Sequence, residues 1–307
     1  MCRARVVVLA VLAALLVVVV TGCSSQTVQP ADLWISNWAD DSVVEYVASS
    51  LSGTPKAGTS ITGPSSPYGL AIDASGNLWT AYVGGSVVEY KAASLAGTPQ
   101  TGTTISGLNE PYDVTFDASG NLWVVDYAAD TVTEYQAASL TSTPQTGTQI
   151  AGLSGPWNAR FDGSGNLWVA EYNGGRVVEY LAASLTGTPT KGATINLTQA
   201  ASLAFDGSGN LWVGTFNGGS VVEYLAASLS GTPQTGTTIT GLADAMGMAF
   251  DPSGNLWVTT YSGNSVVEYL AASLSGTPQT GTSMTGLSGT PSGIAFDPPP
   301  NDLPLSH

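Results

Sequence analysis

The chain has 307 residues, of which only 9% are charged, and 22 acidic side chains against 7 basic ones give a net charge of −15. Nucleic-acid binding is excluded, because it needs clustered Lys and Arg. Two cysteines exclude a disulfide scaffold or a cysteine-rich zinc site, and a single histidine, His307, excludes a Ser-His-Asp triad.

Residues 1–22 predict an export signal. Arg3 and Arg5 precede an apolar run over residues 6–20, which is shorter than the roughly 20 residues that a bilayer span needs. The segment over residues 20–23, Val-Thr-Gly-Cys, resembles the lipobox of bacterial lipoproteins. This resemblance implies that Cys23 is lipidated and becomes the first mature residue. The alternatives are an ordinary signal peptide with a chance cysteine, or an anchor that is never cleaved.

The lipobox predicts where the protein resides. We expect a tether over residues 23–31 and a body anchored to the membrane by the lipid on Cys23. Its location would be the bacterial cell envelope, extracytoplasmic, at the outer membrane or the cell surface. We expect the protein to be a monomer.

One motif then occurs six times between residues 32 and 297. Leu-Trp recurs with spacings of 44 or 45 residues, and Val-Glu-Tyr or Thr-Glu-Tyr follows each copy. One unit predicts four short strands of the types 113–117 (A), 122–127 (B), 86–90 (C) and 103–105 (D), separated by Gly, Pro, Ser and Asn. Four strands in such a period are one propeller blade, so we predict an all-β, six-bladed β-propeller. The repeated tryptophans are Trp34, Trp79, Trp123, Trp168, Trp212 and Trp257.

The ends of the repeat region predict how the ring closes. The first unit begins at strand B, and the sixth unit is followed by a lone strand A over residues 292–297. That last strand can complete the first blade, which removes the open edges of an unclosed ring. Residues 298–307 are expected to be a loose tail.

The pattern F-D-x-S-G-N-L-W-V-x-x-Y followed by V-V-E-Y resembles NHL-repeat propellers, relatives of the gluconolactonase/senescence-marker family and of streptogramin B lyases. The resemblance covers about residues 31–297 and implies the six-bladed fold. It also implies a ligand face that carries the D–A and B–C loops. Function does not follow from it, because such propellers include enzymes, binding modules and sensors. Streptogramin lyases use a histidine base with a metal, and this chain has no internal histidine.

Most conspicuous residues recur in every blade and are expected to be structural. The repeated tryptophans should pack between blades, the aspartates after strand A should form turns, and the glutamates of strand C should face solvent. A second set of aromatic residues follows strand B and predicts either further packing between blades or a rim for a glycan or flat ligand. That set is Trp38, Tyr82, Tyr127, Tyr172, Phe216 and Tyr261.

Candidate site residues are those that break the repeat in blades three and four. If the aromatic residue near the end of strand A pairs with the Trp of strand B, Asp113 lies opposite Asp126. The same register sets Asn158 opposite Glu171. Arg160 stands where the other blades have Ala or Thr, and it is the only base on an inner strand.

Two interpretations of this cluster remain open. Asp113, Asp126, Asn158 and Glu171 supply the oxygen ligands that Ca²⁺ prefers. Alternatively they form a polar network in which Arg160 neutralises Glu171 or Asp126. The first would suit a metal-dependent lactonase or esterase. The second suits the function that we favour, noncatalytic binding of a protein or small molecule. A largely structural surface protein is a third possibility.

Overall fold

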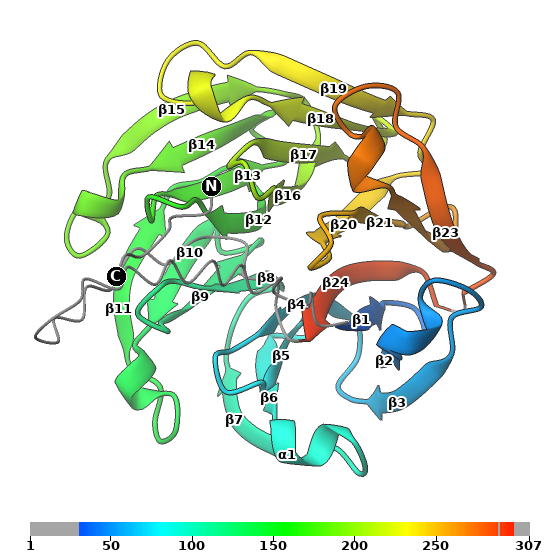
Figure 1. Cartoon of the computed structure of the whole chain (residues 1–307). Coiled ribbons are helices and arrows are strands. Elements are labelled where there is room, and N and C mark those ends of the chain that lie inside the picture. Colours follow the sequence, from blue (N-terminus) through cyan, green and yellow to red (C-terminus); the bar gives the residue numbers. More distant parts are fainter. Residues whose placement is uncertain (1–30, 288, 298–307) are drawn as a thin grey trace, which may run out of the picture.

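The computed structural model describes residues 31–287 and 289–297. They form six four-stranded antiparallel sheets around a central axis (Figure 1). The predicted six-bladed β-propeller is therefore confirmed. The export signal, Cys23 with most of the tether, and the tail over residues 298–307 lie outside the described residues. Within the described part of the chain, no helix is both long and apolar enough to cross a bilayer.

Each blade runs outward from the axis as strands A to D. The strands are β24 (Pro291–Asp297), β1 (Asp32–Asn37), β2 (Ser42–Tyr46) and β3 (Ala57–Thr62) in blade one; β4 (Pro67–Ile72), β5 (Leu78–Tyr82), β6 (Ser86–Tyr90) and β7 (Thr101–Ser106) in blade two; β8 (Pro111–Phe116), β9 (Leu122–Asp126), β10 (Thr131–Tyr135) and β11 (Thr146–Ala151) in blade three; β12 (Pro156–Phe161), β13 (Leu167–Glu171), β14 (Arg176–Tyr180) and β15 (Lys191–Asn196) in blade four; β16 (Ala200–Phe205), β17 (Leu211–Thr215), β18 (Ser220–Tyr224) and β19 (Thr235–Thr240) in blade five; and β20 (Ala245–Phe250), β21 (Leu256–Thr260), β22 (Ser265–Tyr269) and β23 (Thr280–Thr285) in blade six.

A short helical turn joins strands C and D in every blade. These turns are α1 (Ala92–Leu95) and the 3-10 segments η1 (Ala48–Ser50), η2 (Ala137–Ser139), η3 (Ala182–Ser184), η4 (Ala226–Ser228) and η5 (Ala271–Ser273).

Blade one closes the ring as predicted. The C-terminal strand β24 pairs antiparallel with β1, with Leu33 opposite Phe296 and Ile35 opposite Ile294. At the end of this ladder Asp32 lies opposite Asp297. The first and last strands of the propeller therefore lie side by side in one sheet. β1 begins, and β24 ends, at the same end of that sheet.

The A–B turn is held by its aspartate, as the repeat suggests. In blade two, Asp73 accepts hydrogen bonds from the backbone N–H groups of Ser75 and Asn77 at 2.8 and 2.9 Å. Its second oxygen accepts from the Asn77 side chain and from Trp79 Nε1 at 2.9 and 3.1 Å. The turn also needs Gly76, whose φ of +78° favours glycine. The same Trp–Asp bond occurs in blades three to six.

Blade one has no A–B turn, because its strand A is the C-terminal β24. Among the described residues, Trp34 Nε1 has no hydrogen-bond partner although it is buried. The pKa of Asp297 is raised, chiefly by burial and further by the neighbouring carboxylates of Asp32 and Glu45. The closing blade therefore lacks one hydrogen bond that the other five have.

Four of the six glutamates of strand C are buried and the other two are half-buried, so the prediction that they face solvent is wrong. Glu89 is only 3% exposed, and its carboxylate accepts the N–H of Thr103 at 2.7 Å. The register between strands C and D shifts between Val88 and Tyr90, and the glutamate satisfies the N–H that this bulge leaves unpaired. A side chain on Gly102 would clash with this carboxylate. The glycine of strand D therefore leaves room for the glutamate of strand C, and both residues have a structural role.

The main core lies between neighbouring blades. All six repeated tryptophans are 1% exposed. Trp79 meets Phe116 of the next blade edge-on, with ring centroids 6.0 Å apart, and Trp123 meets Phe161 in the same way at 5.7 Å. Burying such side chains stabilises the fold by about 2–3 kcal/mol each. The predicted packing role of the tryptophans is confirmed.

Candidate functional site

The predicted register of the inner hairpins is wrong by one residue. In blade three Thr115 pairs with Trp123, and Asp113 pairs with Val125 rather than with Asp126. The cause is the tight A–B turn, in which the N–H of Asp117 donates to the carbonyl of Asn121 at 3.1 Å.

The same correction applies to blade four. Asn158 pairs with Ala170, and Glu171 lies opposite Pro156. Each inner strand also carries a bulge near its start.

Asp113 and Arg160 form an ion pair across blades three and four. Arg160 Nη1 lies 2.5 Å from Asp113 Oδ2 and also donates to the carbonyl of Ala159 at 2.6 Å. The backbone N–H of Ala159 donates to the same carboxylate at 3.1 Å. Burial raises the pKa of Asp113, and the Arg160 charge and these N–H donors oppose that rise. Arg160 therefore neutralises Asp113, not Glu171 or Asp126.

Asn158 has a similar bridging role one blade further on. Its side-chain oxygen accepts the backbone N–H of Leu203, on strand β16, at 3.0 Å. Asp113 and Asn158 therefore both accept a backbone N–H from the inner strand of the next blade. These repeat-breaking residues join blades three, four and five around the axis.

Asp126 and Glu171 lie at the ends of their B strands and have separate partners. Asp126 accepts the N–H of Asn109 at 2.8 Å, and burial raises its pKa. Glu171 is fully buried and binds Arg176 Nη2 at 2.8 Å. Arg176 was not among the predicted site residues, although it begins a strand where the other blades have Ser or Thr.

The five predicted residues thus divide into the pair Asp113–Arg160, the bridge from Asn158, and two separate carboxylates. Among the described residues, no three His, Cys, Asp or Glu side chains gather closely enough to hold a metal ion. This geometry supports the polar-network interpretation and gives no common coordination site for Ca²⁺.

An aromatic cluster closes the channel where the inner strands begin. The rings of Tyr68 and Tyr112 stack with centroids 4.7 Å apart, and Trp157 Nε1 donates to the Tyr68 hydroxyl at 3.0 Å. That hydroxyl also lies 3.2 Å from Met246 Sδ. This cap was not predicted, although its sequence signal is the aromatic residue that follows a proline at the start of strand A in blades two to four: Pro-Tyr at residues 67–68 and 111–112, and Pro-Trp at residues 156–157.

The second aromatic set surrounds this cap and packs against it. Tyr127 stacks on Tyr112 with centroids 4.5 Å apart and an interplanar angle of 6°, which confirms the packing interpretation for this ring. The prediction is wrong for Tyr82, which does not belong to this set. Its side chain is fully buried at the end of β5, and its hydroxyl lies 2.7 Å from the Tyr90 hydroxyl. Val83 holds the equivalent place in the cluster.

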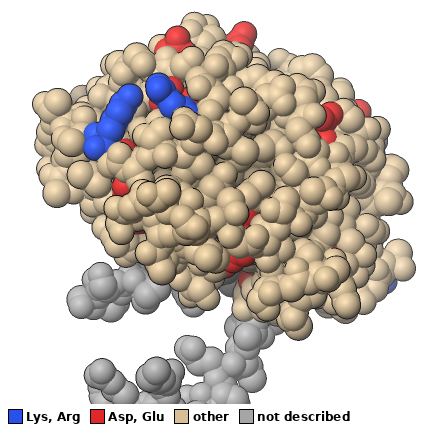
Figure 2. All heavy atoms as spheres, turned by 90° about the horizontal axis from the view of Figure 1, so that it is seen from above, with Lys and Arg blue, Asp and Glu red and all other residues tan. Residues whose placement is uncertain are grey.

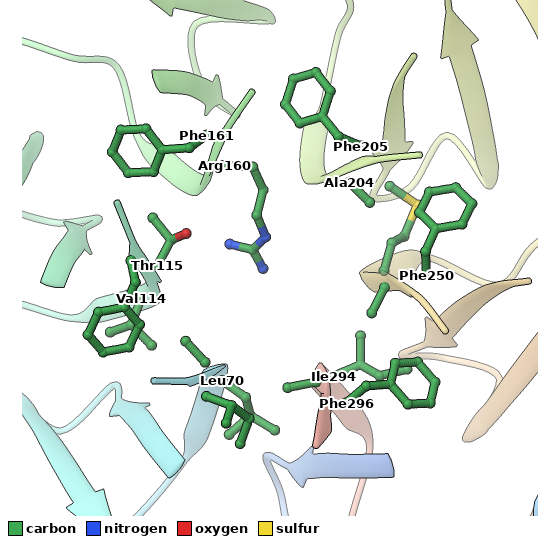
Figure 3. A pocket seen from close by; sticks show the side chains of 16 residues that line it. Leu70, Val114, Thr115, Arg160, Phe161, Ala204, Phe205, Phe250, Ile294 and Phe296 are labelled. Carbon is green, nitrogen blue, oxygen red and sulfur yellow. The ribbon is translucent and has the colours of Figure 1, made fainter. Parts of the chain in front are cut away.

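Below the cap the channel widens into a cavity of about 300 Å³. The last residues of the inner strands line it, so the cavity lies at the A–B turns, on the face opposite the cap. Figure 3 looks into this cavity. Its walls are mainly aliphatic and aromatic, and its lining includes Ala71, Thr115, Ala204, Ala249 and Ala295, which share one level with Arg160.

Arg160 is the one charged residue in the lining of this cavity. Figure 3 shows its guanidinium projecting toward the middle of the space. Nη1 holds Asp113 and the Ala159 carbonyl, whereas no described residue accepts a hydrogen bond from Nε or Nη2. The side chain of Arg160 is 23% exposed and that of Asp113 only 2%. The guanidinium of Arg160 therefore faces the channel, and the carboxylate of Asp113 is turned into the wall.

No protein-family model and no curated protein sequence matches the chain. Solved structures do share its architecture. A chain of a nidogen/laminin complex is 18% identical with a TM-score of 0.68, over 87% of this chain and 98% of that one. A candidate 6-phosphogluconolactonase from Bacteroides fragilis is 12% identical with a TM-score of 0.68, over 89% and 99%. Virginiamycin B lyase from Staphylococcus aureus is 15% identical with a TM-score of 0.53, over 75% and 76%.

These identities establish the fold and nothing finer. The chain has the six-bladed propeller fold, and the solved structures that share this fold include lyase and lactonase-like proteins. Function has to be argued from the residues of its own site.

Proposed function

We propose that this protein is a noncatalytic ligand-binding propeller, held at the bacterial cell envelope by a lipid on Cys23. Its binding site is the central channel beside Arg160. One observation carries this proposal: Asp113 is held by Arg160 and turned into the wall, whereas Arg160 keeps unused donors that face an open cavity.

The chemistry of the chain supports binding over catalysis. A virginiamycin B lyase in which one histidine is replaced by alanine is catalytically inactive. Here the single histidine is His307, ten residues beyond the last strand. Asp113 is neutralised by Arg160 and Glu171 by Arg176, so neither carboxylate is poised as a general base.

The anchor is tested by Cys23→Ser, with Cys2→Ser as the matched control. Wild type and the control should sediment with membranes and carry the added mass of the lipid. Cys23→Ser should be released or remain unprocessed, because it lacks the thiol that accepts the lipid. Unchanged fractionation and unchanged mature mass in Cys23→Ser would refute the anchor.

The noncatalytic role is tested separately by a lactone- and ester-hydrolysis screen with and without added Ca²⁺. We expect no turnover and no calorimetric signal from Ca²⁺. Turnover that disappears in Asp113→Asn would instead establish the hydrolase alternative.

A further inference from the structure

We infer that the central channel binds a single-chain carboxylic acid of medium chain length, with its carboxylate on Arg160 and its apolar chain along the channel wall. This inference rests on the proposed binding role and names the class of ligand for the same site.

The cavity is large enough for a medium-chain acid. Its volume of about 300 Å³ is many times the roughly 10–15 Å³ that one water molecule needs on the same measure, so an acid of the size of octanoate fits. The aromatic cap closes the far end with tightly packed rings, so a long chain cannot pass through the ring of blades.

The lining determines the polarity of the ligand. Leu70, Val114, Met248 and Ile294 line the wall with other apolar side chains, and Arg160 is the single charge among them. An apolar pocket with one group that fixes orientation is the usual form of a small-ligand site. A purely polar ligand would lose its hydration without compensation along these walls.

The spare donors of Arg160 determine which polar group binds. Nε and Nη2 form one side of the planar guanidinium, which is the geometry that a carboxylate binds with two parallel hydrogen bonds. Asp113 already takes Nη1 and is turned into the wall. A cationic ligand would face this guanidinium and be repelled, whereas a carboxylate would be attracted.

The position of Arg160 sets the direction of binding. Arg160 borders both the constriction below the cap and the wider cavity, and Phe161 follows it toward the A–B turns. The carboxylate therefore enters first, and the apolar chain points back past the ring of Phe116, Phe161, Phe205, Phe250 and Phe296.

The open end of the channel is also the end at which the chain is tethered. Asp32 pairs with Asp297 directly beyond Phe296, which itself lines the cavity. Cys23 precedes Asp32 by nine residues, which span at most about 30 Å when extended. A lipid on Cys23 would hold the channel mouth near the bilayer, where apolar acids concentrate.

The first experiment compares three probes of matched chain length by titration calorimetry on the full-length protein. Octanoate should bind in a 1:1 ratio. Octanol and octylamine should bind roughly ten- to a hundredfold more weakly, the effect of losing a charge-assisted hydrogen bond. Equal affinity of octanol and octanoate, or no octanoate binding, would overturn the inference.

The second experiment locates the site with a channel-filling substitution. Ala249→Leu places added carbons in the cavity, and Ala128→Leu makes the same change at an exposed position after β9. Octanoate binding should disappear in the first and stay unchanged in the second. Ala295→Leu provides a second filling variant if the first unfolds. Undiminished binding in both filling variants would show that the acid binds elsewhere.

The third experiment removes the cation without leaving an unpaired buried charge. The double variant Asp113→Asn/Arg160→Gln keeps the wall neutral, so octanoate should bind it no better than octanol does. A preserved preference for octanoate would refute the role of Arg160. If octanoate fails to bind while the anchor and the lack of turnover hold, the ligand class is wrong and the proposed binding role remains.

Discussion

Replacing Arg160 with glutamine should destabilise the propeller, because it leaves the Asp113 carboxylate in the channel wall without its cation. Removing one partner of a fully buried ion pair costs about 3–5 kcal/mol. Here the Arg160 side chain keeps 23% exposure, and Asp113 keeps the N–H of Ala159. We therefore expect a loss of about 2–3 kcal/mol at pH 7.5, measured by urea denaturation with an unchanged m-value.

This loss should depend on pH in a defined direction. Burial already raises the pKa of Asp113, and loss of Arg160 raises it further above the unfolded value of about 3.9. Because the pKa of Asp113 is higher in the folded state than in the unfolded state, the loss of stability grows as the pH rises above the unfolded-state pKa. The difference from wild type should therefore nearly vanish at pH 4.

The double variant Asp113→Asn/Arg160→Gln is the control for this reasoning. It removes the carboxylate as well as the cation, so most of the stability at pH 7.5 should return. An equal loss for Arg160→Gln at pH 4 and pH 7.5, with no recovery in the double variant, would refute the charge argument. The effect would then be one of packing alone.

Three further predictions concern the closing blade. Trp34→Phe should cost about 1 kcal/mol less than Trp212→Phe in chemical denaturation, because only the second change breaks an Nε1 hydrogen bond; equal losses would contradict this account. Asp297→Asn should stabilise the protein by up to about 1 kcal/mol at pH 7. Because its folded-state pKa is raised, the gain should fade toward pH 4, and a gain independent of pH would refute the electrostatic cause. Deleting residues 291–307 removes β24 and should abolish cooperative unfolding or cause aggregation, whereas deleting residues 298–307 should not; calorimetry distinguishes these results, and a cooperative transition after the longer deletion would refute the closure.

The repeat made most of the fold predictable from sequence. A spacing of 44 or 45 residues between tryptophans fixes the number of blades, and the missing first strand predicts that β24 completes the ring. The packing of the tryptophans between neighbouring blades follows from strand alternation. These features depend on local patterns that a single sequence displays.

The errors arose where backbone irregularities decide the outcome. One hydrogen bond between Asp117 and Asn121 sets the register of the inner hairpin, and residue types alone do not reveal it. The strand-C glutamates are buried because a bulge leaves an N–H unpaired, which alternation cannot show. Arg160 was expected to neutralise Glu171 or Asp126 but pairs with Asp113, because the true register places Asp113 opposite Val125 rather than opposite Asp126.

The closure of blade one also determines how the molecule bears a mechanical load. A pull on the N-terminal segment enters the propeller at Asp32, the first residue of β1. This strand is flanked by β24 on one side and β2 on the other, so the force shears two ladders of hydrogen bonds at once. Had the first strand been the outermost of its sheet, the same pull would have peeled one ladder bond by bond. The composite blade places β1 in the interior of its sheet, where two ladders share such a load.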